Sequence, residues 1–163
     1  MKLPWRRSPD VPQDPDPGRD LPITVERVPG PAADILRLDR LHNLTFSGHM
    51  AGAAFEGAWE RERGRIVVAR RGGYWLGYTL ASAPDDEDYP GWWIIKLIGV
   101  RPTEQSSGVG TAVTREMIRW LAEDGATLIC ATANSEGGQR TLNRLGFSHD
   151  PEWGTSLRLD GPS

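Results

Sequence analysis

The sequence predicts one α/β domain, an α+β mixed sheet with about six strands and four helices. Its β-rich and helix-periodic segments follow one another as strand, two helices, three strands, helix, strand, helix and strand, which departs from regular βαβ repetition. A chain of 163 residues with 38% hydrophobic and 25% charged residues has the size and composition of one soluble domain. We therefore expect a single domain over residues 21–160, without an internal repeat.

Residues 1–20 differ in composition from the rest of the chain, because they contain five prolines and four aspartates and few side chains that could pack. Proline removes backbone donors and the aspartates repel one another, so this segment is predicted to be a disordered leader outside the fold. No apolar stretch follows the basic residues at its start. We therefore expect no signal peptide and a cytoplasmic location.

The domain is expected to begin with a strand and two helices. A β-rich run over 21–28 ends at Pro29, which is followed by a glycine and a second proline. Apolar side chains recur about every three residues over 32–44, which predicts a helix, and a weaker helical pattern follows over 49–62.

Three strands are predicted next. The β-rich runs 65–70 and 75–83 are separated by Arg-Gly-Gly, which is typical of a hairpin turn. After an acidic loop at Asp85–Asp88, the nearly continuous apolar run 92–100 predicts the central strand, buried on both faces.

The last third alternates helices with strands. Apolar residues at helical spacing predict a helix over 108–123, which Gly125 ends. A strand is expected over 127–132, a helix over 136–145 and a final strand over 155–159.

The composition excludes several classes of function. The formal net charge is −3, whereas domains that bind the nucleic-acid backbone usually have a basic excess, so no nucleic-acid partner is expected. Three histidines and one cysteine, without metal-ligand spacing, predict no metal site. The most apolar run, 91–100, is far shorter than the ~20 residues that span a bilayer, so no membrane segment is expected.

The loop between the strand 92–100 and the helix 108–123 has the features of an anion site. Gly108 and Gly110 let backbone N–H groups approach a ligand, and a helix N-terminus carries partial positive charge, so a pyrophosphate would fit. The loop lacks the Gly-Lys-Ser/Thr of a P-loop, and Val113 replaces the third glycine of a dinucleotide fingerprint. A G-x-G pattern by itself has a second interpretation, because such glycines also allow a helix to pack tightly against a sheet.

The same loop is part of a longer pattern. It contains, in one register, Val100, Pro102, Gln105, Gly108 and Gly110, and the next strand and helix are followed by Asn134 and by Gly146-Phe147 respectively. This pattern resembles the GNAT superfamily of acetyl-CoA-dependent N-acyltransferases, which has V-x-P-x-x-Q/R-x-x-G-x-G/A between its fourth strand and third helix. The resemblance covers about residues 21–160 and is most specific between 92 and 147.

The resemblance implies that acetyl-CoA is the co-substrate. Backbone groups would hold the coenzyme A pyrophosphate at Gln105, Ser106, Ser107, Gly108, Val109 and Gly110. Ile98 and Val100 would pair with the pantetheine arm, which Asn134 would also contact. The acyl group would pass directly from the thioester to an amine in a ternary complex, and a backbone N–H near Ile98 would stabilise the oxyanion by ~2.7–4 kcal/mol.

The sequence departs from the family pattern at two catalytic positions. Leu142 stands where the family often has a tyrosine that protonates the leaving thiolate, and Ile94 where some members have a glutamate base. Water could protonate the thiolate, because an unperturbed thiol has a pKa of ~8.5. The weak substitutes for the missing acid are Thr141, Asn143 and Ser135.

A base is still needed, because an alkyl amine is mostly protonated at neutral pH. Glu104 is the catalytic residue that we predict, although a solvated loop residue of this type is also ordinary. The acidic run Asp85–Asp88, His42 and His49 are further candidates for the base, and for each of them a surface or packing role is the more ordinary interpretation.

Five other residues have weaker functional interpretations. Cys130 lies in an apolar strand and is expected to be a small buried hydrophobe, not a nucleophile. Trp92 and Trp93 point to opposite faces, so one of them would line the acceptor groove. Arg140 and Arg144 share a helix face, which is either a contact for a coenzyme phosphate or an exposed basic stripe.

The leading hypothesis is an N-acetyltransferase acting on a small-molecule or protein amine, and the acidic run favours a cationic acceptor. A second hypothesis is a non-catalytic acyl-CoA-binding or interaction module, because Leu142 and Ile94 remove the usual acid and base. A third hypothesis is a nucleotide-phosphate enzyme that uses the same loop, but the sequence contains no magnesium-binding motif. Family members often pair through their sheets, so a homodimer is a further expectation.

Overall fold

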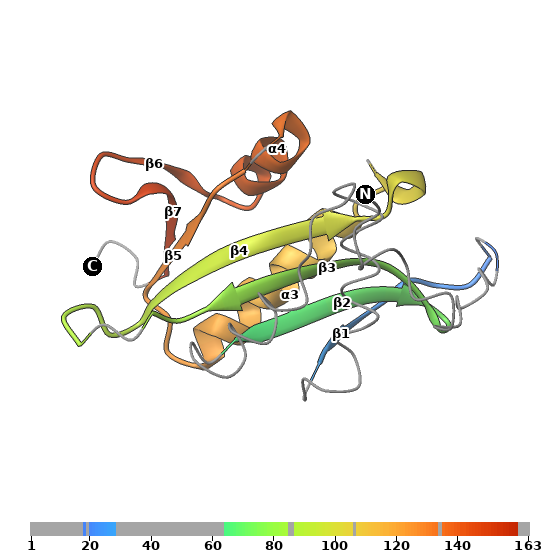
Figure 1. Ribbon diagram of the computed structural model, residues 1–163, viewed down its shortest axis with the longest axis horizontal. Helices are drawn as coiled ribbons and strands as arrows, with labels where there is room; N and C mark the ends of the chain where they lie inside the picture. Colours follow the sequence, from blue (N-terminus) through green and yellow to red (C-terminus); the bar gives the residue numbers. More distant parts are fainter. Residues whose placement is uncertain are drawn as a thin grey trace, which may run out of the picture.

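The computed structural model describes residues 18, 20–28, 64–84, 87–105, 107–133 and 135–159. These residues form a seven-stranded sheet with the order β1-β2-β3-β4-β5-β7-β6 (Figure 1). Its strands are β1 (Thr24–Arg27), β2 (Arg65–Arg71), β3 (Tyr74–Ser82), β4 (Trp92–Val100), β5 (Leu128–Ala131), β6 (Ser148–Asp150) and β7 (Gly154–Arg158). All neighbouring strands are antiparallel except β4 and β5, which are parallel.

The described helices pack on one face of this sheet. They are α3 (Val109–Glu123) and α4 (Glu136–Arg144), and a single 3-10 turn, η1 (Pro102–Glu104), lies between β4 and α3. Helical spacing puts one apolar stripe of α3 against β2, β3 and β4, and its fully buried members are Val109, Val113, Met117 and Leu121. Leu142 of α4 belongs to the same core, so α3 and α4 share one layer.

The opposite face of β2 and β3 has a second, smaller apolar cluster, because successive side chains of a strand alternate between the two faces. It consists of Val28, Ile66, Val68, Trp75, Tyr78 and Leu80. The register of β3 with β4 shifts between Leu80 and Ala81, which oppose Leu97 and Ile95, so Lys96 is an inserted bulge residue in β4. The bulge lies at the middle of the strand on which the candidate site depends.

Arg27 ties the edge strand β1 to α3. Its Nε lies 3.0 Å from Oε1 of Glu116, its Nη1 lies 2.6 Å from Oε2 of Glu123, and its guanidinium lies 5.2 Å from the Trp120 ring centroid. These hydrogen bonds raise the pKa of Arg27 above its ordinary value and lower that of Glu123. The charge pairs and the ring contact join β1 to α3.

The predicted mixed α/β sheet is confirmed, and β4 is its central strand, but three details differ from the sequence-based expectation. β6 was not expected, so the described residues contain seven strands rather than about six. β4 is not buried on both faces, because its neighbour β5 leaves it after Ile95, and Lys96 is exposed. The predicted helices over 32–44 and 49–62, and nearly all of the predicted leader, lie outside the described residues.

Candidate functional site

β4 has a strand neighbour on both sides along only half of its length. Its register with β5 runs from Trp92 opposite Leu128 to Ile95 opposite Ala131, whereas its pairing with β3 continues to Val100. Figure 1 shows β5 diverging from β4 beyond this point and leading towards α4. In the described chain no strand lies on the β5 side of the last five residues of β4. An extended ligand with amide groups can therefore lie along this edge, as an added strand would.

The N-terminus of α3 lies beside the open end of β4. Gly108 is its N-cap residue and has φ 88° and ψ 2°, a left-handed conformation that favours glycine. No side chain caps the helix, and its first turn contains no acidic residue. Because the first N–H groups of an α-helix have no intrahelical acceptor, this uncapped terminus has the donors and the partial positive charge that an anion requires.

Gly110 joins the helix N-terminus to the open edge of the strand. A Cβ atom at this position would lie 3.4 Å from Cγ2 of Val100, 3.9 Å from Cγ2 of Ile98 and 4.0 Å from Oγ1 of Thr141. The structure therefore brings together Ile98, Val100 and Gly110, three residues that the sequence assigned to one site. Gln105, Ser107 and Gly108 are exposed beside them, and Val109 packs into the core. Ser106 and Asn134 lie outside the described residues.

Two charged residues fasten the loop before α3 to the β2–β3 hairpin. Nε of Arg101 donates to the carbonyl of Trp75 at 2.8 Å, and its guanidinium lies 4.1 Å from the Tyr74 ring centroid. The carboxylate of Glu104 lies 3.0 Å from Nη2 of Arg71, and these two side chains are only 6% and 4% exposed. The burial of Glu104 does not favour the role of catalytic base that the sequence suggested, and that role stays a prediction.

The polar side chains considered as substitutes for the missing acid lie on α4 or at its N-cap. Leu142, at the family's tyrosine position, is 1% exposed in the core and has no proton to give. Ser135 accepts a hydrogen bond from the backbone N–H of Gly138 as the N-cap of α4, and Asn143 pairs with Gln139. The remaining residue, Thr141, is the one whose hydroxyl approaches the α3 N-terminus, although it also donates to the carbonyl of Gly137.

The two tryptophans at the start of β4 point to opposite faces, as predicted. Trp93 is buried in the core beneath α3, whereas Trp92 lies on the other face, where its indole Nε1 donates to Sγ of Cys130 at 3.3 Å. Burial raises the pKa of the Cys130 thiol, which makes it a poor nucleophile. Cys130 is half-buried rather than fully buried, because β4 and β5 begin to separate beside it.

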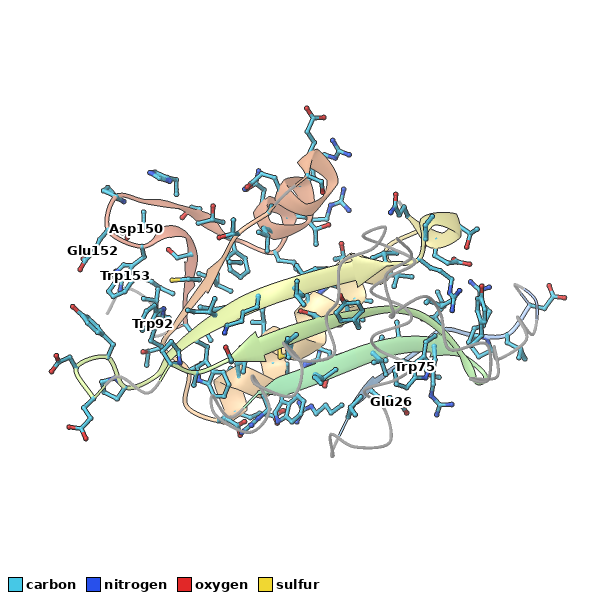
Figure 2. All side chains as sticks on the ribbon, viewed as in Figure 1. Glu26, Trp75, Trp92, Asp150, Glu152 and Trp153 are labelled. Atoms are coloured by element: carbon cyan, nitrogen blue, oxygen red, sulfur yellow. The ribbon has the colours of Figure 1, made fainter. Side chains whose placement is uncertain are left out.

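Trp92 belongs to a group of three aromatic rings. Its ring centroid lies 5.4 Å from that of Trp153, which follows β6, and 6.1 Å from that of Tyr89, in the turn before β4. Tyr89 and Trp153 are 4.9 Å apart in an edge-to-face contact. Figure 2 shows Trp92 and Trp153 together, with Glu152 and Asp150 beyond them. Sequence reasoning missed Tyr89 and Trp153, and alternation along β4 was the only signal that pointed to this face.

The other candidate groups contribute little to the geometry. Glu87 and Asp88 are exposed in the turn after β3, whereas the rest of the acidic run, His42 and His49 lie outside the described residues. Arg140 and Arg144 are exposed on α4, and Arg140 lies 3.9 Å from the carboxylate of Glu136.

Two negative findings apply to the same part of the chain. Within the described ranges, no three His, Cys, Asp or Glu side chains are placed to bind a metal ion. Neither described α-helix combines the length and the apolar character that crossing a membrane requires.

The sequence comparisons agree with this geometry. The model of the acetyltransferase (GNAT) family matches residues 34–147. A mycothiol acetyltransferase of Mycobacterium avium (strain 104) is 30% identical over 165 residues, which cover 80% of this chain and 50% of that protein. A mycothiol acetyltransferase of Mycolicibacterium paratuberculosis shows the same identity and coverage. The chain thus spans about half the length of the curated relatives it matches.

Solved structures show the same fold. The ribosomal-protein-S18-alanine N-acetyltransferase of Escherichia coli superposes with a TM-score of 0.69 at 13% identity, covering 86% of this chain and 96% of that one. A GNAT family acetyltransferase of Brucella melitensis, in complex with acetyl-CoA, has a TM-score of 0.64 at 18% identity, covering 86% and 90% of the two chains. The family match, the relatives and the open strand beside the uncapped helix agree, and the chain belongs to the acetyltransferase (GNAT) family.

Proposed function

We propose that this chain transfers the acetyl group of acetyl-CoA to a primary amine. The observation that carries the proposal is the contact of Gly110 with Val100 and Ile98, which makes the anion site of α3 continuous with the open edge of β4. A ligand that joins a pyrophosphate to a long amide-containing arm needs both features in this order. The Brucella melitensis structure in complex with acetyl-CoA supports this choice of ligand, because its fold is the same.

The reaction requires one bond to form and one to break. The neutral amine nitrogen attacks the thioester carbonyl carbon, a C–N bond forms and the C–S bond breaks. The nitrogen gives up one proton as the amide forms, and the released thiolate takes up one proton. The amine first loses its own proton to water or to a side chain, since an alkyl ammonium has a pKa near ~10.4. A backbone N–H near Ile98 would stabilise the oxyanion by ~2.7–4 kcal/mol. Because Leu142 has no proton, Thr141 or water would protonate the thiolate.

The acceptor is proposed only as a primary amine, without a named molecule. The relatives and neighbours have different names, among them mycothiol acetyltransferase and ribosomal-protein-S18-alanine N-acetyltransferase. These names support acetyl transfer and do not choose the acceptor of this chain, because one fold serves many functions. A cytoplasmic location and a homodimer stay predictions.

A non-catalytic acyl-CoA-binding module is the second candidate, because two expected catalytic groups are absent or engaged elsewhere. Leu142 is buried hydrocarbon, and Glu104 is held by Arg71. Under this alternative the chain also binds acetyl-CoA, but it does not acetylate an amine.

A matched pair of glycines tests the donor site. Gly108 and Gly125 lie at opposite ends of α3, have φ of 88° and 89°, and have no atom within 4 Å of an added Cβ. Gly108→Trp and Gly125→Trp therefore impose similar backbone strain, but only the first places a bulky ring at the anion site. We expect calorimetry to show acetyl-CoA binding to wild type and to Gly125→Trp, little binding to Gly108→Trp, and no binding of ATP.

The calorimetric result has clear consequences. A folded wild-type protein that does not bind acetyl-CoA contradicts the proposal, as does binding that Gly108→Trp leaves unchanged. Where acetyl-CoA binds, a thiol-release assay over a panel of amines separates an enzyme from a binding module. Turnover of an amine supports the enzyme, and binding without turnover across the panel supports the module.

A further inference from the structure

Lys96 is a charged residue in the middle of an otherwise apolar strand. In the register of β4 with β3, Ile95 and Leu97 oppose consecutive residues of β3, so Lys96 is the extra residue of the bulge. The side chain of Lys96 is exposed, whereas Ile95 is buried and Leu97 is partly buried. Since a bulge changes the direction in which a side chain points, the fold directs this amine out of the core.

Lys96 is also the first residue of the open half of β4. Ile95 is the last residue of β4 that pairs with β5, and Figure 1 shows β5 diverging beyond that point. Ile98, beside which the thioester of a bound donor would lie, follows two residues later and thus ~7 Å along the strand. Lys96 and the reactive end of the donor would therefore share one open edge.

The side chain of Lys96 is long enough to reach that thioester. Five single bonds of ~1.5 Å join its Cα to its Nζ, which gives an extended lysine a reach of about 6 Å. An attacking nitrogen needs to come only within ~3–3.5 Å of the carbon that it attacks. Together these lengths exceed the ~7 Å that separate Lys96 from Ile98 along β4. The flexible stem of a lysine lets Nζ sample this position.

The residue type at this position is unusual for the chain. Of its 19 basic Lys and Arg residues, only Lys2 and Lys96 are lysines, so the domain over residues 21–160 has its one lysine at the bulge. Binding an anion would not require a lysine, since the planar guanidinium of arginine pairs with a carboxylate at least as well. A neutral lysine amine differs from a guanidinium because it is a nucleophile. The choice of lysine therefore favours accepting an acyl group over pairing with a charge.

We propose, resting on the acetyltransferase function proposed above, that bound acetyl-CoA acetylates Lys96 of the same chain when no acceptor amine is present. The ammonium group of Lys96 first loses a proton to water. Its neutral Nζ then attacks the thioester carbonyl carbon, a C–N bond forms and the C–S bond breaks. Nζ gives up a second proton as the amide forms, and the coenzyme A thiolate takes up one proton. The product is an acetylated side chain that has lost its positive charge.

The test measures acetylation at each lysine separately. The purified protein is incubated with acetyl-CoA without an acceptor and digested with chymotrypsin, and mass spectrometry follows the peptides that contain Lys2 and Lys96. A bound donor and a neighbouring amine react as one molecule. We therefore expect Lys96 to be acetylated at least about tenfold faster in the folded protein than in the urea-unfolded protein. Lys2 serves as the reference for reaction with acetyl-CoA from bulk solution.

The matched glycine variants show whether the acetyl group comes from the donor site. Gly108→Trp places a ring at the start of α3, so we expect Lys96 acetylation to fall to the rate of the unfolded protein while Lys2 is unaffected. Gly125→Trp changes the other end of α3, where an added Cβ also meets no atom within 4 Å, and is expected to behave as the wild type. Lys96→Arg keeps the charge and is expected to gain no acetyl group at this position.

Three results overturn the proposal and leave the acetyltransferase proposal to the amine panel. The first is a protein that binds acetyl-CoA while its Lys96 stays unmodified. The second is Lys96 acetylation that Gly108→Trp leaves unchanged although it abolishes acetyl-CoA binding. The third is a rate constant that rises with protein concentration, which indicates transfer between molecules. Failure of the wild type to bind acetyl-CoA in calorimetry overturns both proposals.

Discussion

Removing the carboxylate of Glu104 is expected to destabilise the protein strongly. Glu104 and Arg71 are 3.0 Å apart, and their side chains are 6% and 4% exposed, so Glu104→Ala leaves a guanidinium charge in a buried place. Breaking a buried ion pair on one side costs about 3–5 kcal/mol. A domain of this size loses ~2–4 °C of Tm for each kcal/mol, so the expected fall in Tm is about 6–20 °C.

Thermal unfolding followed by circular dichroism measures this effect directly. The matched control is Glu136→Ala, because that carboxylate is 97% exposed and lies 3.9 Å from Arg140. A surface substitution of this kind is expected to change the free energy of unfolding by no more than about 0.5 kcal/mol. An unchanged Tm in Glu104→Ala would refute the reasoning.

A double variant separates the anchoring role of Glu104 from the catalytic role suggested by the sequence. Arg71→Leu with Glu104→Leu removes both buried charges and recovers stability relative to Glu104→Ala, since two apolar groups replace the pair. If Glu104 anchors the loop, this double variant keeps acetyl-CoA binding and most of the turnover. If Glu104 is the base, the folded double variant still binds acetyl-CoA but has lost turnover. The fall of kcat/KM at acidic pH that the wild type shows is then also absent from any residual activity.

Three further predictions follow from single contacts. Gly99→Ala is expected to destabilise the protein by about 1–3 kcal/mol in urea unfolding, because the new Cβ would overlap Cε1 of the fully buried Tyr78. Unchanged stability would show that the ring can move. Burial raises the pKa of Cys130, so alkylation by iodoacetamide is expected to have its pH midpoint above that of the urea-unfolded chain, and equal midpoints would contradict this. The hydrogen bonds of Arg27 lower the pKa of Glu123 in the folded protein, so their stabilisation is present above the unfolded pKa and is lost as the pH falls through the folded one. Arg27→Gln is expected to flatten this acid dependence of Tm, and a wild-type dependence in the variant would exclude the pair as its source.

The sequence predicted elements whose periodicity decides their structure. The apolar stripe of α3 is buried as its spacing required, and the opposite directions of Trp92 and Trp93 follow from alternation. β6 could not be predicted, because Ser148–Asp150 has no apolar pattern and is a strand only through its pairing with β7. The sequence also did not predict that half of β4 lacks a neighbour on the β5 side, because an apolar run does not show where pairing with a neighbouring strand ends.

The candidate site was predictable where a local motif defines it and unpredictable where distant residues meet. Gly108 and Gly110 could be placed at the start of a helix from the loop sequence alone. The burial of Glu104 depends on Arg71, which is on another strand, and nothing in the loop indicates that partner. Trp153 likewise reaches Trp92 through the turn between β6 and β7, which no periodicity connects with β4.

The short register between β4 and β5 has a mechanical consequence. Four residue pairs join the β1–β4 part of the sheet to the part formed by β5, β7 and β6, and the shared core beneath α3 and α4 reinforces this seam from one face. We expect such a seam to act as a hinge between the two parts of the sheet, so that small opening motions of the sheet occur mainly there. A molecule lying in the gap bridges both parts, and its arrival would slow amide exchange on strands that it never touches.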